Sequence, residues 1–271
     1  VRRRRIDPMK SPSPAPLRRE PGTSLHRQLF MVLRDQIAQG VYPVGALIPA
    51  EDALGTQFSV SRITVRRAVS DLEHLGLVEK QPGRGTFVRA APRRPRPQPT
   101  LGLLDSLGKQ ARETEVTVLK VETAPAPPAI AEQLQLAPGE GAVHAVRLRS
   151  VQGTPMMVTD AWVPGDVGQH ITEAALQQRA LFEILLGEGV QFGRVIQEMS
   201  AVAADPTTAG LLRVEVGAPL VRLVRVLHDR DKRPVQCITI HFTGERSRVL
   251  MDVPAEAINT TGAGQIVHDL E

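Results

Sequence analysis

Basic side chains at helical spacing form the first candidate site. Arg62 and Arg66 lie one helical turn apart in the segment 60–72, and Thr64 stands between them. A guanidinium can donate two hydrogen bonds to guanine O6 and N7 or bind a phosphate, and a threonine can contact a phosphate or a thymine methyl. These residue types at this spacing predict a helix that reads DNA through Arg62, Thr64 and Arg66.

An apolar stripe of helical period predicts how these side chains are held. The stripe comprises Val65, Ala68, Val69, Leu72 and Leu75. Ser61 suits the N-cap of this helix, because its hydroxyl can accept a hydrogen bond from an unpaired first-turn amide, and Gly76 suits its left-handed end. Residues 49–58 predict a preceding helix. Helix, turn and basic helix together indicate a helix-turn-helix, with Ser61 at the DNA-facing tip.

A glycine-containing hairpin follows the basic helix. Residues 77–80 and 86–88 predict two short strands joined by the turn 81–85. Glycines in this turn let the backbone approach a surface closely, and the turn presents Arg84. The segment predicts a wing that presents Arg84 to DNA.

Four motifs in this order resemble the winged helix-turn-helix of GntR-type bacterial transcription regulators. The resemblance implies that the residues at the positions of Arg62, Thr64, Arg66 and Gly83 contact the operator. One position departs from the family, which often has an arginine that touches DNA where this chain has Asp52. Operator preference is therefore expected to differ at that base. The motifs occupy residues 38–45, 49–51, 60–68 and 83–88.

Length and charge divide the chain into two functional parts. Its 271 residues suit two domains. Residues 1–100 carry 18 Lys and Arg against 8 Asp and Glu, whereas residues 101–271 carry 15 against 21, so the first part should be attracted to a polyanion. We expect a disordered basic tail (1–22), a winged DNA-binding domain (23–89), a proline-rich linker (90–99), an effector-binding and dimerisation domain (100–252) and a C-terminal tail (253–271).

Several classes of protein are disfavoured. No apolar run approaches the roughly 20 residues of a membrane span, so no membrane partner is expected. Cys237 is the single cysteine, which fits a reducing cytoplasm. The sequence has no Cys/His metal spacing, nucleotide loop or catalytic serine motif, so it predicts no metal, no cofactor and no enzyme.

The second part contains a pseudo-repeat of strand pairs. Strands at 143–151 and 220–229 each follow a short helix, and each returns after a turn, through 155–163 and 234–242. With further strands at 115–123 and 194–203 and a helix at 180–186, this pattern indicates an antiparallel sheet with flanking helices, an α+β fold. Residues 100–252 resemble the ligand-sensing domain of the HutC-type branch of the GntR family, which implies a chorismate-lyase-like fold. The residues that carry this resemblance are 147–149 and 153–155, with 244–246 a weaker match.

Paired arginines form the second candidate site. Arg147 and Arg149 lie two apart on one strand, hence on one face, where two guanidinium groups can trap a phosphate or a carboxylate. The family resemblance implies that they line an effector pocket; they could instead be solvated or paired with acids. Arg194 and Glu198 share a face of their own strand and complete the predicted effector site. Glu198 could accept a hydrogen bond from the effector or neutralise Arg147 or Arg149.

Three functions remain to be compared. The first is a repressor that binds a palindromic operator as a homodimer, with half-sites about one helical turn apart, and is released by a small anionic effector. The second is a DNA-binding protein whose second domain only dimerises. The third, a lyase-like enzyme, is suggested by the fold resemblance alone. The residues favour the first, and they do not identify the effector or the operator.

Overall fold

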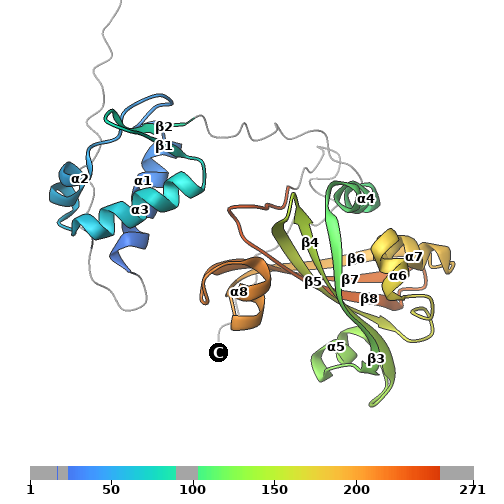
Figure 1. Ribbon diagram of the computed structural model, residues 1–271. Coiled ribbons are helices and arrows are strands. Elements are labelled where there is room, and N and C mark those ends of the chain that lie inside the picture. The colour runs from blue at the N-terminus through green and yellow to red at the C-terminus, as the bar shows by residue number, and fades with distance from the viewer. Residues whose placement is uncertain (1–16, 18–23, 90–102, 251–271) are drawn as a thin grey trace, which may run out of the picture. The chain divides into compact units, whose positions relative to one another are not determined.

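The computed structural model describes residues 17, 24–89 and 103–250 (Figure 1). The expected linker and C-terminal tail lie outside the described residues, as does the expected basic tail apart from Leu17. The chain divides into two compact units, residues 1–96 and 97–271, which are described separately. In the part of the chain that the structure describes, no helix has the length and apolar character needed to cross a membrane.

The first unit is a winged helix-turn-helix. Leu29, Phe30 and Leu33 of the first helix pack against the apolar stripe of α3, which is buried from Val65 to Leu72. Leu75, the last residue of the predicted stripe, follows the helix and is 44% exposed. The helices of this unit are α1 (Leu25–Ala38), α2 (Glu51–Phe58) and α3 (Arg62–His74), and its strands are β1 (Val78–Gln81) and β2 (Gly85–Val88).

Both predicted boundaries of α3 are confirmed. The Ser61 Oγ accepts a hydrogen bond from the Thr64 backbone N–H at 3.3 Å, which caps the first turn. Gly76 follows the helix with a φ of +68°, a conformation that glycine adopts without a Cβ penalty. These local signals set where the basic helix begins and ends, and thus which side chains stand at its tip.

The wing is an antiparallel pair of strands. Val78 pairs with Val88 and Gln81 with Gly85. Gly85 has a φ of +113°, and a Cβ at this position would lie 2.5 Å from Cδ1 of Leu47. A larger residue at Gly85 would therefore displace the Leu47 side chain, and the positive φ would strain its backbone.

The second unit is built on one antiparallel sheet with the strand order β3-β4-β5-β8-β7-β6. The two halves of the pseudo-repeat meet where β5 pairs with β8, and β3 and β6 form the edges. The expected α+β class is confirmed. The strands are β3 (Glu115–Pro125), β4 (Gly141–Val151), β5 (Thr154–Pro164), β6 (Phe192–Ala203), β7 (Pro219–Asp229) and β8 (Pro234–Phe242).

Helices cover both faces of the sheet. One face, here called the arginine face because it carries Arg147 and Arg149, packs against α6 and α7 through Leu176, Ile184 and Leu185. The opposite face packs against α5 and α8. The helices are α4 (Leu103–Glu113), α5 (Pro128–Leu134), α6 (Glu173–Gln178), α7 (Leu181–Gly187) and α8 (Pro206–Leu212).

Candidate nucleic-acid interface and effector site

The tip of α3 presents the predicted DNA-reading side chains to solvent. Arg62 and Arg66 are exposed, with 73% and 68% of their side-chain surfaces accessible. Thr64 is half-buried, and its hydroxyl shares a hydrogen bond of 2.9 Å with that of Ser61. The apolar stripe from Val65 to Leu72 is buried on the other side of the helix. The basic side therefore faces solvent and is available to a partner.

The first turn of α2 places two carboxylates beside these arginines. Both oxygens of Asp52 engage Arg62, at 2.6 Å from Nε and 2.7 Å from Nη2. Glu51 makes a longer contact of 3.4 Å with Nε of Arg66. The sequence pattern did not predict these pairs, because the turn between α2 and α3 decides which side chains meet.

Ile63 is an exposed residue that the helical pattern did not single out. Its relative exposure is 80%, which is unusual for a large aliphatic side chain between two DNA-reading positions. Apolar side chains can contact the thymine methyl in the major groove. The signal in the sequence was an isoleucine lying off the apolar stripe.

The wing carries its arginine at the turn. Arg84 follows Gly83, which has a φ of +71°, and its guanidinium carbon lies 5.7 Å from the ring centroid of Phe87. Stacking on the ring orients the guanidinium while leaving its N–H groups available. The turn can therefore present a preformed donor to a phosphate or a base.

The paired arginines of β4 lie in the core of the second unit. Arg147 and Arg149 are only 3% and 6% exposed, and strand alternation places both on the arginine face. Nη1 of Arg149 donates to Oγ1 of Thr114, just beyond α4, at 2.8 Å. The Nε and Nη1 of Arg147 are buried without a hydrogen-bond partner among the described residues. A buried cation with open donors is what an anion-binding site requires.

Burial changes the proton affinity of both groups. Burial and, to a smaller extent, the neighbouring charge of Arg149 together lower the pKa of Arg147 to about 9. Burial also lowers the pKa of Arg149, although the carboxylate of Glu183 in α7 opposes this effect. Arg147 thus remains charged at neutral pH, at a cost that a bound anion would offset.

The structure separates Arg194 and Glu198 from the arginine pair. Strand β6 lies four positions from β4 in the sheet, and its register places Glu198 opposite Val224, on the face away from Arg147. Glu198 pairs with Arg222 at 3.1 Å. The expectation that Glu198 could neutralise Arg147 or Arg149 is wrong, and Arg194 and Glu198 do not share a pocket with them.

Other polar residues on the arginine face extend the candidate site. Arg225 is 8% exposed, and its Nε donates to Oε1 of Gln197 at 2.8 Å. Gln236 is buried on the neighbouring strand, and its Oε1 has no hydrogen-bond partner among the described residues. The pseudo-repeat aligns Arg225 with Arg147, which was the signal for this second buried cation. His241 lies on the opposite face, as strand parity predicts for a residue five positions from Gln236.

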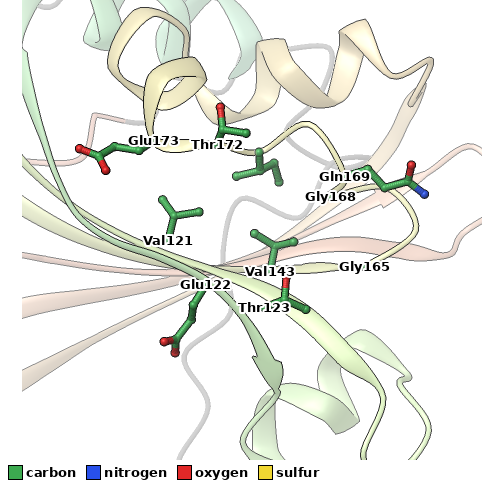
Figure 2. Close-up of a pocket in the computed structure, with 10 residues that line it drawn as sticks. Val121, Glu122, Thr123, Val143, Gly165, Gly168, Gln169, Thr172 and Glu173 are labelled. Carbon is green, nitrogen blue, oxygen red and sulfur yellow. The ribbon is translucent and has the colours of Figure 1, made fainter.

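A separate open hollow of about 610 Å³ lies at the β3 edge (Figure 2). Its walls come from β3, from β4 and from the segment between β5 and α6, and neither Arg147 nor Arg149 lines it. The charged residues that line it are Glu122, whose carboxylate pairs with Lys120 at 2.7 Å, and Glu173, so the hollow offers an anion no cationic side chain among the described residues. The buried arginines are therefore the better candidate for an anionic ligand. The described residues include no cluster of three or more His, Cys, Asp or Glu arranged to hold a metal ion.

Curated relatives match most of this chain. It is 29% identical over 234 residues to the "Probable fructoselysine utilization operon transcriptional repressor" of Escherichia coli (strain K12), which covers 84% of this chain and 95% of that protein. It is 28% identical over 200 residues to the mannosyl-D-glycerate transport/metabolism system repressor MngR of the same strain, covering 74% and 83%. It is 24% identical over 226 residues to the HTH-type transcriptional repressor NagR of Bacillus subtilis (strain 168), covering 82% and 91%.

A solved structure and two family models agree with this similarity. The crystal structure of PhnF from Mycobacterium smegmatis matches with a TM-score of 0.52 and 22% identity over 84% of this chain and 99% of that one, which supports the fold. The model for bacterial regulatory proteins of the gntR family matches residues 25–88, and the UTRA domain model matches residues 109–248. The chain therefore belongs to the GntR family of bacterial transcription regulators, in the branch with a UTRA domain, and not to an enzyme family.

Proposed function

We propose that this regulator represses transcription by binding a palindromic operator as a homodimer, and that a small anionic metabolite releases it. Ser61, Arg62, Thr64 and Arg66 of α3, with Gly83 and Arg84 of the wing, form the proposed DNA contacts. All of them except the half-buried Thr64 are exposed, which supports this assignment. The names of the three curated relatives, each a repressor, favour repression.

The observation that carries the effector proposal is the state of Arg147. Its guanidinium is buried, charged at neutral pH and open at Nε and Nη1. Such a group is stabilised when a phosphate or carboxylate supplies the missing acceptors. Arg149, held by Thr114, would provide a second donor to the same anion.

A second polar group on the effector would meet Arg225 and Gln236. These residues lie on the same face as Arg147. Gln236 on β8 is two strands away and Arg225 on β7 is three, about 10 Å and about 14 Å between backbones. Long side chains from both sides shorten these spans. The arrangement fits a compact metabolite with an anionic group at one end and hydrogen-bonding groups at the other.

The edge strand β6 is the proposed dimer surface. Three apolar side chains of this strand are exposed: Val195 by 37%, Ile196 by 44% and Met199 by 42%. Val195 and Met199 lie on one face of the strand and Ile196 on the other. An exposed apolar edge strand is a template for pairing with another chain, so a second copy is a suitable partner. Sedimentation of Ile196→Lys should give monomers where the wild type gives dimers.

A thermal-shift screen of the full chain tests the effector proposal. Inorganic phosphate, phosphorylated sugars and small carboxylates are added to the wild type, to Arg147→Met and to Arg222→Met, a matched variant on the opposite face. We expect an anion to stabilise the wild type and Arg222→Met by roughly 2.7 kcal/mol at a hundredfold excess over Kd, but not Arg147→Met. The same anion should release the DNA upstream of the protein's own gene in a gel shift.

The opposite result separates the two parts of the proposal. Tight DNA binding with no stabilising anion would leave the second unit as a dimerisation domain only. An anion that stabilises Arg147→Met as strongly as the wild type would place the effector elsewhere.

A further inference from the structure

The contact between Asp52 and Arg62 has a specific geometry. Oδ1 lies 2.6 Å from Nε and Oδ2 lies 2.7 Å from Nη2, so the carboxylate occupies the Nε–Nη2 edge of the guanidinium. A guanidinium has five N–H donors in a planar fork. The pair uses two of them and leaves the Nη1–Nη2 edge with two parallel N–H groups.

Stability does not explain this pair. The side chains of Arg62 and Asp52 are 73% and 64% exposed. Ion pairs this exposed contribute little to folding, because water screens the charges and ordering two long side chains costs entropy. A function at the surface of the helix is a better reason for an acid at this position.

We propose that Asp52 is a specificity-determining positioning residue that holds Arg62 for recognition of a guanine. With one edge fixed by Asp52, the free edge of Arg62 offers the two donors that guanine O6 and N7 accept. The carboxylate also neutralises Arg62 and repels phosphates, which disfavours nonspecific contact with the DNA backbone. Asp52 thus acts through Arg62 and need not touch DNA.

Glu51 and Arg66 provide an internal comparison. Their contact is a single one of 3.4 Å, and Glu51 also lies 3.9 Å from Nζ of Lys80. One long contact restrains a guanidinium less than a two-point pair does. The positioning role therefore belongs to Asp52, which makes the two-point contact. Glu51→Gln should change base preference less than Asp52→Asn does.

Selection from a randomised duplex pool tests the inference, because the bound fraction itself reveals the operator sequence. The full-length wild type, Arg62→Ala, Asp52→Asn and Asp35→Asn are each used to select DNA. Asp35→Asn removes the same charge from α1, where Asp35 pairs with Arg34 at 3.3 Å, and serves as the matched control. Melting temperatures of all four proteins are compared, and binding to the selected site and to unrelated DNA is measured over a range of salt concentrations.

The inference rests on the proposed DNA contact by Arg62, and the variants distinguish the two. We expect Arg62→Ala and Asp52→Asn to lose guanine preference at the same base, by about tenfold in Asp52→Asn, while Asp35→Asn keeps it. Asp52→Asn should also bind unrelated DNA more tightly, with a salt slope steeper by about one.

Two outcomes would overturn it. If Arg62→Ala loses the guanine and Asp52→Asn keeps it with an unchanged salt slope, Asp52 does not position Arg62. If Arg62→Ala selects the wild-type sequence, the proposed DNA contact itself fails, and the role of Asp52 fails with it.

Discussion

Arg147 and Arg149 lie side by side on β4, yet only Arg149 finds a side-chain hydrogen-bond partner among the described residues. Nη1 of Arg149 donates to Thr114 at 2.8 Å, whereas Nε and Nη1 of Arg147 find no acceptor among the described residues. Both groups are buried. One arginine is thus held in place by the protein, and two donors of the other remain open among the described residues.

Replacing Arg147 with methionine should stabilise the effector-free protein. The change removes a buried charge whose pKa burial lowers to about 9, and keeps an apolar side chain of similar length. Replacing a buried ion pair with well-packed apolar residues is often neutral or stabilises by about 1 to 4 kcal/mol, and we expect a gain in this range for a buried charge without a partner among the described residues. Urea unfolding of the wild type, Arg147→Met and Arg149→Met measures the effect. Arg149→Met removes the hydrogen bond to Thr114 and should therefore gain less free energy of unfolding. If Arg147→Met is instead destabilised, the charge of Arg147 has a partner in the folded protein.

Arg246 should be essential to the packing of the second unit. Its Nη1 donates to the carbonyls of Pro155 at 2.9 Å and Leu212 at 2.6 Å, joining the segment after β8 to β5 and to the end of α8. We expect Arg246→Ala to cost about 2 kcal/mol or more, since it leaves several acceptors unpaired. The control is Arg213→Ala, which removes one exposed bond to the carbonyl of Gly153 at 3.2 Å and should cost less than half as much in thermal unfolding.

Asp205 should stabilise α8 in a pH-dependent way. Its Oδ1 accepts from the backbone N–H groups of Thr207 at 2.8 Å and Thr208 at 3.0 Å, and hydrogen bonds from Thr208 lower its pKa. A lowered carboxyl pKa adds stability that is present above the ordinary pKa and is lost as the pH falls through the folded value. Asp205→Ala should cost about 1 kcal/mol at pH 7.

A comparison of unfolding between pH 7 and pH 3 checks this assignment. The difference in free energy of unfolding between the wild type and Asp205→Ala should be smaller at pH 3 than at pH 7. Asp205→Asn keeps an acceptor for the cap and should lack this pH dependence. An unchanged difference at both pH values would mean that the carboxylate charge does not contribute.

Cys237 should be inert in the folded protein. The thiol is fully buried and donates to Oε1 of Gln133 at 2.9 Å. Burial, with the charge of Asp160, raises its pKa to about 11, so at pH 8 about one thiol in a thousand is ionised. Reaction with a disulfide reagent should be at least about a hundredfold slower in buffer than in urea. Equal reaction rates in buffer and in urea would show that α5, which carries Gln133, detaches readily from the sheet.

Local patterns in the sequence were enough to predict much of the fold. Helical period and capping by Ser61 and Gly76 define α3, because these signals act within one turn of the chain. Alternation within β4 places Arg147 and Arg149 on one face for the same reason. Helix α6 was not predicted, since its six residues are too short to show a period.

Relationships between elements needed the tertiary structure. Within one strand, the alternation of side chains shows which residues share a face. The faces of β4 and β6, however, are related only through four successive strand pairings. The face that carries Glu198 could therefore not be matched with that of Arg147 from the sequence. The pair of Asp52 and Arg62, ten residues apart, likewise depends on the turn between two helices. Sequence alone determined most of the elements and which side chains each of them presents, because these depend on nearby residues. Only long-range packing decided which side chains meet.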